Sequence, residues 1–427
     1  MKIAFIGGFA FSPKGTMRAR AHPLAVELVR LGHQVTIFLP PYDNIGDCGK
    51  KWEAEGVRIT NVGHPDYGHR PSPRVFRYPR MLWQLLSDVK RYSPNLIHVF
   101  KPKGFSGAAG TYFLLRGKPP VVLDCDDWEG WGGWNDIKSY PRIVKEYIDW
   151  QERWMIRRAS AVTVASRALE NRAVELRGKA DDVYYVPNCR PSATNHALQD
   201  RIAGLSREEI RRELGWNDAP AILFSGHIEG KESLEFFARA AGPICQKLAA
   251  MVVFVGYEPE SARIQRLFAA HNDVKRLILP RLDYEHFLKV VRACDVAAFP
   301  YKDDAVHRAK CSARIVDYMA MGRAVLTSAV GQNCEYIVDG ESGVLAIPGD
   351  EVDFAQKLER LLRNPQWAGQ LGENARKQVT QNFNWSGQAL QQCLQAYDRA
   401  FASQPARGKL VRNSSPPALQ SRSRVKS

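Results

Sequence analysis

The sequence predicts an α/β protein with two doubly wound, Rossmann-like domains that face each other across a cleft. Short apolar runs, many of them β-branched, alternate with segments of helical periodicity. This alternation occurs twice, once between Lys2 and Pro191 and again between Ala221 and Pro348. The stretch between the two series is polar, so we interpret it as a connector.

The expected boundaries follow from composition and turns. The Val-Pro-Asn turn that ends at Asn188 closes the first series, and a helix with an apolar face follows the second. The tail is rich in Ser, Pro and Gln, and its six basic residues have no acidic partner. We therefore predict an N-terminal domain (1–190), a linker (191–218) with one short helix over 207–214, a C-terminal domain (219–382), a closing helix (383–402) and a basic disordered tail (403–427).

Composition limits the function. The chain has 427 residues and a formal net charge of +15, which favours acidic partners such as nucleotides or phospholipid surfaces. No nucleic-acid-binding module is recognisable, so we expect no nucleic acid partner. The eight cysteines show no paired spacing, which argues against a disulfide or zinc framework. Because the chain starts with a strand and has no long apolar run, we expect a cytoplasmic protein that is at most peripheral to a membrane.

The first loop and a later basic segment have two readings each. Gly7 and Gly8 follow the strand Lys2 to Ile6 but do not match the GxGxxG dinucleotide pattern, so we favour an open loop that faces the cleft.

The segment 69–92 interleaves basic and aromatic residues. It can lie on an anionic membrane or hold an acidic acceptor, and the alternative is a packed helix with a solvated basic rim.

Polar side chains gather where two predicted strands end, at 95–102 and 121–127. The carboxyl ends of parallel strands face the ligand crevice, so these side chains are candidates for binding. The candidates are His98, Lys101, Asp126, Asp127 and Glu129. Asp124 and Asp126 also fit a DxD pattern, but two carboxylates alone are a poor cation cage, and we predict no metal site. We expect one carboxylate to bind or polarise a sugar.

The stretch from His307 to Pro348 organises the second half. It predicts a helix that ends at Gly322, a buried strand over 324–328, a short helix near Asn333 and a further strand. Lys310, Arg314 and Asp317 lie around the first helix, where an anion and a ribose diol could bind. The alternative is an ordinary helix–strand unit with solvated charges.

Together these motifs resemble the retaining glycosyltransferases of the GT-B fold, in the large group 1 or family 4 class. The resemblance rests, in chain order, on HVFKPKGFSG, DCDDWEG, VPN, SGHIEGK, DYMAMGRAV and NCEYIVDGESG. It covers most of residues 1–401. It implies that the second domain holds a nucleotide-sugar donor, that the first holds a sugar, glycan or lipid acceptor, and that no cofactor or metal is needed.

The resemblance also implies roles for single residues. Asp317 would hold the donor ribose, and Lys231 would contact the diphosphate. Backbone amides near Gly8 and at the turn from Asn333 to Glu335 would assist. The implied donor site comprises Gly8, Gly226, His227, Lys231, Lys310, Arg314, Asp317, Asn333 and Glu335, with Lys231, Arg314 and Asp127 as catalytic candidates. The implied acceptor site comprises His98, Lys101, Asp126 and Glu129.

Two positions depart from the family pattern. The glutamate that usually stands eight positions before Asp317 is Ala309 here, and His227 replaces the arginine that usually accompanies the lysine. Arg314 or Lys310 could supply the missing charge, and Asp303 or Asp304 could replace the glutamate. The favoured function is transfer of a hexosyl group from a nucleotide sugar. A nucleotide-sugar epimerase and a non-catalytic binding partner on the same fold are the alternatives.

Overall fold

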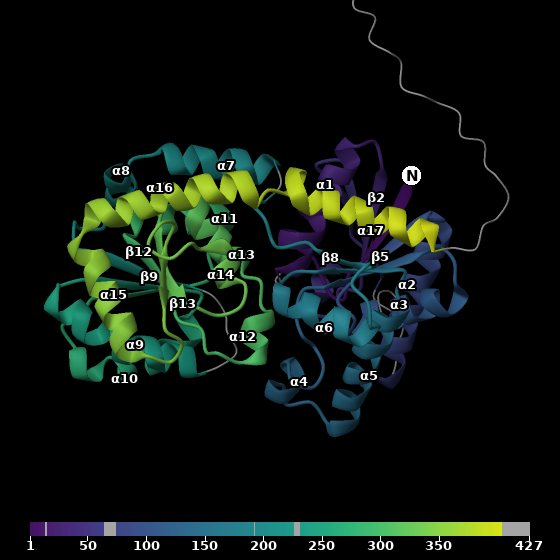
Figure 1. The fold of residues 1–427 in the computed structure, drawn as a ribbon, viewed down its shortest axis with the longest axis horizontal. Helices are drawn as coiled ribbons and strands as arrows, with labels where there is room; N and C mark the ends of the chain where they lie inside the picture. Colours follow the sequence, from purple (N-terminus) through teal and green to yellow (C-terminus); the bar gives the residue numbers. More distant parts are fainter. Residues whose placement is uncertain (13–14, 64–73, 192, 226–230, 404–427) are drawn as a thin grey trace, which may run out of the picture.

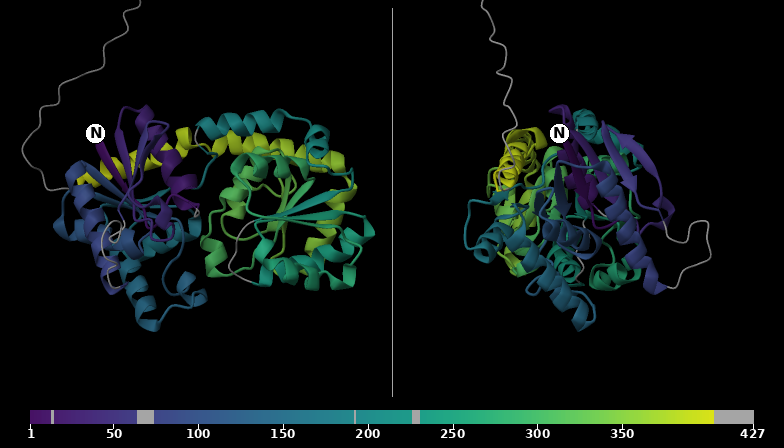
Figure 2. Two further views of the ribbon diagram at one scale, coloured as in Figure 1. Left: turned by 180° about the vertical axis from the view of Figure 1, so that it is seen from behind. Right: turned by 90° about the vertical axis from the view of Figure 1, so that its right-hand side faces the viewer.

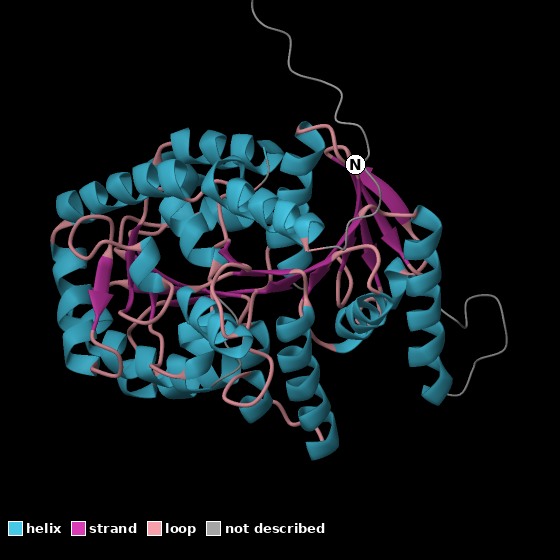
Figure 3. Ribbon diagram, turned by 45° about the vertical axis from the view of Figure 1, so that its right-hand side comes forward, coloured by secondary structure: helices cyan, strands magenta, loops and turns pink. Residues whose placement is uncertain are grey.

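The computed structural model describes residues 1–403 except 13–14, 64–73, 192 and 226–230. Two α/β domains lie side by side, each with a central sheet that helices cover (Figure 1). The predicted fold class is confirmed. Figure 3 shows the strands enclosed by helices in both halves. Because both faces of each sheet are covered, the central strands are apolar throughout rather than alternating. For example, every residue of β5 (Leu96–Phe100) is buried.

The N-terminal sheet has eight strands in the order β3-β4-β2-β1-β5-β6-β7-β8. All neighbours are parallel except β3 and β4, which form an antiparallel pair at one edge. The remaining strands are β1 (Lys2–Ile6), β2 (Gln34–Leu39), β3 (Lys51–Ala54), β4 (Val57–Asn61), β6 (Val121–Cys125), β7 (Ala161–Val164) and β8 (Val183–Tyr185). The helices are η1 (Met17–Ala21), α1 (His22–Arg30), α2 (Arg74–Tyr92), α3 (Gly104–Arg116), α4 (Trp134–Ile137), α5 (Arg142–Arg158) and α6 (Arg167–Arg177), with the short turn η2 (Ile45–Asp47).

The C-terminal sheet has six parallel strands in the order β11-β10-β9-β12-β13-β14. They are β9 (Ala221–Ser225), β10 (Met251–Val255), β11 (Arg276–Leu279), β12 (Val296–Phe299), β13 (Ala324–Ser328) and β14 (Val344–Ala346). Its helices are α9 (Lys231–Lys247), α10 (Ser261–Leu267), α11 (Tyr284–Ala293), α12 (Ala305–Ala309), α13 (Ala313–Ala320), α14 (Asn333–Tyr336), α15 (Glu351–Arg363) and α16 (Pro365–Asn382), with the turns η3 (Glu258–Glu260) and η4 (Ala269–His271).

The end of α13 follows the predicted signals in part. Gly322 lies just after the helix with φ +64°, a left-handed conformation that glycine adopts without strain. Ser312 occupies the N-cap position, as its residue type favours, but its side chain makes no capping hydrogen bond.

The last helix belongs to the first domain. After α16 the chain passes through η5 (Trp385–Ala389) into α17 (Leu390–Ala402), which packs on β6, β7 and β8. Figure 1 shows α16 and α17 in succession along one side of both domains. The apolar face of α17 is buried at Leu390, Cys393, Ala396, Tyr397 and Ala400.

His98 is part of this contact. Its Nδ1 lies 3.0 Å from the Tyr397 hydroxyl and its Nε2 lies 3.2 Å from Thr163 Oγ1. Its exposure is 0%, and burial lowers its pKa to about 3, so the ring is neutral. This position conflicts with the acceptor contact predicted for His98. The residue joins the sheet to the closing helix instead.

Several elements of the structure were not predicted. The linker contains α7 (Ala193–Gly204) as well as the predicted short helix, which is α8 (Arg207–Glu213). The antiparallel pair of β3 and β4 consists of short strands with polar residues, so periodicity does not reveal it. Within the described residues, no helix is long and apolar enough to span a bilayer.

Candidate functional site

The ends of β5 and β6 bring four predicted residues together. Lys101 adopts φ +70°, which is uncommon for a residue with a side chain, and its amide donates to the Asp124 carbonyl. Its ammonium group lies 3.0 Å from Asp126 Oδ1, 2.5 Å from Asp127 Oδ2 and 3.2 Å from Glu129 Oε1. We call Lys101, Lys103, Asp126, Asp127 and Glu129 the lysine–carboxylate cluster.

The cluster has three carboxylates for two ammonium groups. Burial opposes the charge of Lys101, but Asp126, Asp127 and Glu129 outweigh it and raise its pKa. Burial also opposes ionisation of Glu129, yet Lys101 and Lys103 lower its pKa to about 2. For Asp127 burial wins, and its pKa is raised. Asp127 is therefore the carboxylate of this cluster best suited to exchange a proton or to hold a hydroxyl group.

A cavity of about 860 Å³ opens in front of this cluster, within the N-terminal domain. Lys101, Asp127 and Glu129 line it together with Gly8 and Thr16 from the first loop. A Cβ at Gly8 would lie 2.9 Å from Ser106 Oγ, so glycine lets the loop approach α3 closely. Gly8 therefore lies on the cavity that belongs to the predicted acceptor side, although the resemblance placed it at the donor.

The DxD pattern divides between two tasks. Asp124 is buried and forms a two-point ion pair with Arg20, at 2.7 and 2.6 Å. Asp126 accepts a hydrogen bond from Thr16 at 2.9 Å and pairs with Lys101. Arg20 holds η1 to β6 and also donates to the Val186 carbonyl at 2.7 Å. The sequence analysis missed Arg20, because a buried partner 104 residues away leaves no local signal.

Asp317 lies on α13 with its carboxylate buried. Its Oδ1 accepts hydrogen bonds from the Tyr284 hydroxyl at 2.7 Å and from Gln199 Nε2 at 3.1 Å. Arg314 Nη1 lies 4.0 Å from Oδ2. Burial raises the pKa of Asp317, and Arg314 opposes that shift. Tyr284 follows the carboxyl end of β11, so the strand-end rule that found Lys101 could have found it too.

Arginines from both domains approach this carboxylate. Arg314 lies with its guanidinium 4.0 Å from the centre of the Phe287 ring. The pKa of Arg281 is lowered first by burial and then by the nearby positive charges of Arg18 and Arg314. Arg18 belongs to η1 of the N-terminal domain, whereas Arg281 and Arg314 belong to the C-terminal domain. Three like charges in one region favour an anionic ligand there.

Lys310 lies near enough to the lysine–carboxylate cluster for its charges to affect it. Burial lowers its pKa, the negative charge of Asp127 opposes that shift, and Lys101 adds to it. Lys310 comes from the C-terminal domain, and Asp127 and Lys101 come from the N-terminal domain. Lys310 therefore places a positive charge of the predicted donor domain next to the lysine–carboxylate cluster.

The turn around α14 does not offer the predicted diphosphate contacts. The amides of Asn333 and Glu335 donate to the carbonyls of Val330 and Gln332, at 3.1 Å each. The Asn333 side chain is buried and donates to Thr327 Oγ1, at 3.1 Å. The Glu335 carboxylate lies 3.6 Å from Arg167 of the other domain. The Asn333 side chain therefore supports the turn and Glu335 contributes to the domain contact, and a ligand contact of the Glu335 carboxylate stays a prediction.

The remaining predictions divide between described and undescribed residues. Gly226 and His227 lie outside the described residues, and Lys231 is described only as the first residue of α9. Asp303 pairs with Arg308 at 2.5 Å, and Asp304 caps α12 through the His307 amide at 2.9 Å. Neither aspartate takes the place of the family glutamate at Ala309. Ala309 is 1% exposed, and its carbonyl accepts a hydrogen bond from Ser166 at 2.7 Å.

Comparison with known proteins assigns each domain. Residues 15–189 match the family described as "Glycosyl transferase 4-like domain". Residues 219–364 match the family described as "Glycosyl transferases group 1". Together the two matches span well over half of the chain. The first match contains the strands of the N-terminal sheet from β2 onward, and the second contains the strands of the C-terminal sheet.

Two curated relatives share low identity with the chain. The alpha-D-kanosaminyltransferase of Streptomyces kanamyceticus is 22% identical over 275 residues, which are 63% of this chain and 69% of that protein. Spore coat protein SA of Bacillus subtilis is 24% identical over 421 residues, which are 93% of this chain and 100% of that protein.

Solved structures share the fold over nearly the whole length. Sucrose-phosphate synthase from Thermosynechococcus elongatus has a TM-score of 0.73 at 22% identity, and the match covers 94% of this chain and 99% of that one. The Anabaena protein HepE in complex with UDP-glucose has a TM-score of 0.66 at 16% identity, with 93% and 100% covered.

Proposed function

Since the chain belongs to the group 1 glycosyltransferases of the GT-B fold, we propose that it moves a hexosyl group from a nucleotide sugar to an acceptor hydroxyl. The nucleotide sugar would bind the C-terminal domain, and the acceptor would bind the N-terminal cavity. The same family membership makes the chain an enzyme and favours a glycosyltransferase over the two alternatives, an epimerase and a non-catalytic partner.

One observation carries the proposal. The lysine–carboxylate cluster lines the cavity of the N-terminal domain, and Lys310 of the other domain lies beside Asp127. An acceptor hydroxyl in the cavity would therefore be close to the positive charges that an anionic donor needs. HepE, which shares the fold, was crystallised with UDP-glucose. This complex supports a uridine nucleotide sugar as the first donor to test.

The proposed reaction uses charge and position. The bond between the sugar carbon C1 and the phosphate oxygen breaks, and the acceptor oxygen bonds to C1. Lys231, Lys310 and Arg314 would stabilise the negative charge on the departing phosphate. Asp127 would hold the acceptor or donor hydroxyl in place. We propose that attack occurs on the face from which phosphate leaves, with retention, and that the acceptor proton passes to the departing phosphate.

The proposal includes no metal. The convergence of Arg18, Arg281 and Arg314 supplies positive charge where a cation would otherwise be needed.

The proposed function also includes peripheral contact of the protein with an anionic membrane. In α2, Trp83 is 71% exposed in a helix whose sequence includes Arg80, Lys90 and Arg91.

The test is a binding screen followed by a transfer assay. Purified protein is titrated by calorimetry with UDP, GDP and ADP and their common sugars, with magnesium and with EDTA. We expect one nucleotide to bind equally in both conditions. In Asp317→Ala we expect its affinity to fall roughly 10- to 100-fold, because a charge-assisted hydrogen bond contributes about 1.5–3 kcal/mol. The control is Asp303→Ala, which removes an exposed pair with Arg308.

Two results would contradict the proposal. One is that no nucleotide or nucleotide sugar binds a folded protein. The other is that Asp317→Ala and Asp303→Ala lower the affinity equally, because the effect would then be unspecific. Release of free hexose from the bound nucleotide sugar in the absence of an acceptor gives a first measure of turnover, and Lys310→Ala should lower its rate at unchanged stability.

A further inference from the structure

The cavity of the N-terminal domain has its charged groups mainly at one end. Apart from the lysine–carboxylate cluster, the first loop and Lys138, its lining is largely aromatic and aliphatic. One wall comes from η2, α2 and α3, and the opposite wall comes from α4 and α5. These apolar lining residues include Ile45, Tyr78, Phe105, Trp134, Val144 and Ile148. The many hydroxyl groups of a glycan would find few hydrogen-bonding partners on such walls, whereas an apolar chain would fill them.

The walls are built as a continuous aromatic surface. Tyr78 stacks on Phe105 with ring centres 4.1 Å apart, and Tyr42 lies 5.4 Å from the same ring. On the opposite wall the Lys103 ammonium lies 5.3 Å from the centre of the Tyr140 ring. The polar cluster and the apolar walls therefore meet at Lys103, as a site for a polar group attached to an apolar body requires.

The apolar surface continues out of the cavity onto α4 and α5. Residues 131–150 expose seven large apolar side chains, which we call the apolar platform: Trp131, Ile137, Tyr140, Ile143, Val144, Tyr147 and Trp150. Ile143 is 79% exposed and Trp150 is 49% exposed. Tyr140, Val144 and Tyr147 belong both to the platform and to the cavity lining. An exposed patch of this kind marks an interaction surface.

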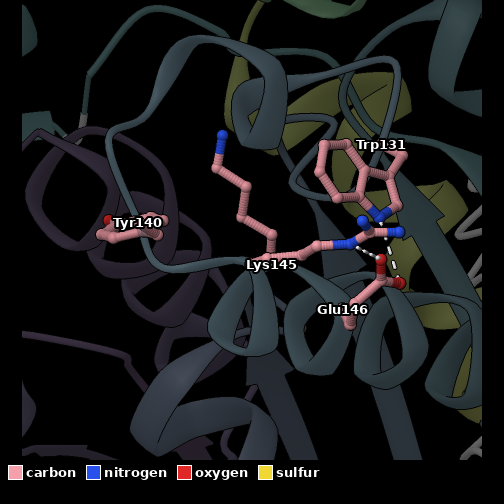
Figure 4. Close-up of a pocket in the computed structure, with 5 residues that line it drawn as sticks. Trp131, Tyr140, Lys145 and Glu146 are labelled. Atoms are coloured by element: carbon pink, nitrogen blue, oxygen red, sulfur yellow. Dashed lines mark hydrogen bonds and ion pairs between the residues drawn. The ribbon is translucent and has the colours of Figure 1, made fainter.

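Basic side chains stand among these rings. The Lys145 ammonium lies 5.5 Å from the Trp131 ring and the Lys138 ammonium lies 5.3 Å from the Trp134 ring. Figure 4 shows Lys145 beside Trp131 and Tyr140 in a second hollow, of about 630 Å³, where Glu146 accepts a hydrogen bond from Trp131 Nε1 at 3.3 Å. Aromatic rings with cations beside them are typical of surfaces at the membrane–water interface.

The apolar platform is also accessible to the flat surface of a membrane. The segment with α4 and α5 projects beyond the rest of the N-terminal domain in Figure 1 and in both views of Figure 2. It lies on the opposite side of the domain from α17. A membrane could therefore contact the platform without approaching the closing helix.

We propose that the acceptor carries a long apolar chain, that this cavity takes the chain, and that the apolar platform rests on the anionic membrane from which the acceptor comes. This inference rests on the proposed function and names the acceptor class of its site. The polar head of the acceptor would lie at the lysine–carboxylate cluster, and the chain would run between the two walls toward the platform. Lys138 and Lys145 would face the anionic lipid headgroups.

The membrane contact is tested with vesicles. Full-length protein is sedimented with two kinds of vesicle. One kind contains phosphatidylcholine alone, and the other, which is anionic, also contains about 30% phosphatidylglycerol. We expect binding to the anionic vesicles and at least a tenfold loss of affinity in the double variant Ile143→Glu/Trp150→Glu. The control is Val352→Glu, a 66% exposed residue of α15 in the other domain, which should bind as the unaltered protein does.

The chain contact is tested in solution with dodecyl glucoside and butyl glucoside, whose neutral heads carry hydroxyl groups. We expect dodecyl glucoside to bind at least tenfold more tightly, and Ile45→Asp to remove that difference while vesicle binding is kept. Ile45 lines the cavity, is 53% exposed and lies outside the platform, so its replacement leaves the fold and the membrane contact intact.

The outcomes separate this inference from the proposed function. Nucleotide binding is measured on every variant. If nucleotide binding is normal while vesicles do not bind and both glucosides bind equally, the inference is overturned and the proposed function stands. If the double variant instead converts a dimer into a monomer by light scattering and no vesicle binds, the platform is a contact between copies of the chain. Absence of nucleotide binding in the unaltered protein overturns the proposed function itself.

Discussion

At the scale of residues, three aspartates that are close in sequence have different structural roles. Asp124 pairs with Arg20 in the core, whereas Asp126 and Asp127 pair with Lys101 on the cavity. The strand-end rule predicted that Lys101, Asp126, Asp127 and Glu129 would meet, because parallel strands deliver their carboxyl ends to one edge. The same rule failed for His98, which lies in the middle of β5, and local sequence does not show that α17 covers it.

Glu129 gives a prediction for acid stability. Its pKa is about 2 in the folded protein and 4.5 in the reference state, so the fold favours its ionised form. The stabilisation is present above pH 4.5 and is lost as the pH falls toward 2. We expect the melting temperature of Glu129→Gln to be lower at neutral pH and to fall less steeply between pH 5 and 3.

The loss at neutral pH should be about 3 kcal/mol, because the change removes the carboxylate that pairs with the partly buried Lys103, whereas Lys101 keeps Asp126 and Asp127. Differential scanning calorimetry over this pH range gives both quantities. Glu341→Gln, at an exposed turn, is the matched control.

The pH dependence of Asp127 has the opposite sign. Its pKa is raised in the folded protein, so its contribution to stability is present at low pH and is lost as the pH rises through the folded pKa. An Asp127→Asn variant with the same flattened profile as Glu129→Gln would refute the assignment.

At the scale of elements, the sequence was most informative where periodicity is strong. The apolar strands of both sheets and the amphipathic α17 follow from their patterns. The helix α7 was missed because its apolar residues are few, and it is held by polar contacts such as that of Gln199 with Asp317. The pair of β3 and β4 was missed because both strands are short and because β3, at the edge of the sheet, has no buried residue.

Tyr397 tests how α17 is fixed to the sheet. In Tyr397→Phe the ring packing is kept but His98 Nδ1 loses its buried partner. We expect a loss of about 1–3 kcal/mol in the free energy of unfolding, measured by urea denaturation with far-ultraviolet circular dichroism. Tyr184→Phe removes a hydroxyl from a partly exposed residue of β8, and it should change the stability by less than about 0.5 kcal/mol. Equal losses in the two variants would show that the His98 contact is unimportant.

At the scale of the whole molecule, a few polar contacts join the two domains. Asn188 Nδ2 donates to the Cys311 carbonyl at 2.7 Å, and the Tyr336 hydroxyl donates to the Asn188 carbonyl at 2.6 Å. Cys311 follows Lys310 directly in the chain, and the charge of Asp126 in the lysine–carboxylate cluster acts on it. The two-domain architecture could be read from the repeated alternation of strands and helices. The contacts between domains could not, because they join residues more than a hundred positions apart.

Asn188 provides the corresponding prediction. In Asn188→Ala the Cys311 carbonyl loses its side-chain donor, so the two domains should separate more easily. We expect a larger radius of gyration by small-angle X-ray scattering and a lower turnover, with circular dichroism unchanged. Asn374→Ala, which removes a hydrogen bond within the C-terminal domain, is the control. A variant that keeps its radius of gyration but still loses turnover would point to a direct role of Asn188 instead.

The return of α17 to the first domain sets an order for biosynthesis. The ribosome makes the N-terminal sheet first, yet Leu390–Ala402 emerges after the whole C-terminal domain. The strand β8 ends at Tyr185, so about 200 residues separate the sheet from its covering helix, or roughly 10 to 40 seconds of translation. During that interval the nascent N-terminal domain exposes the face around His98. Translation of the second domain therefore has to finish before the first domain is complete.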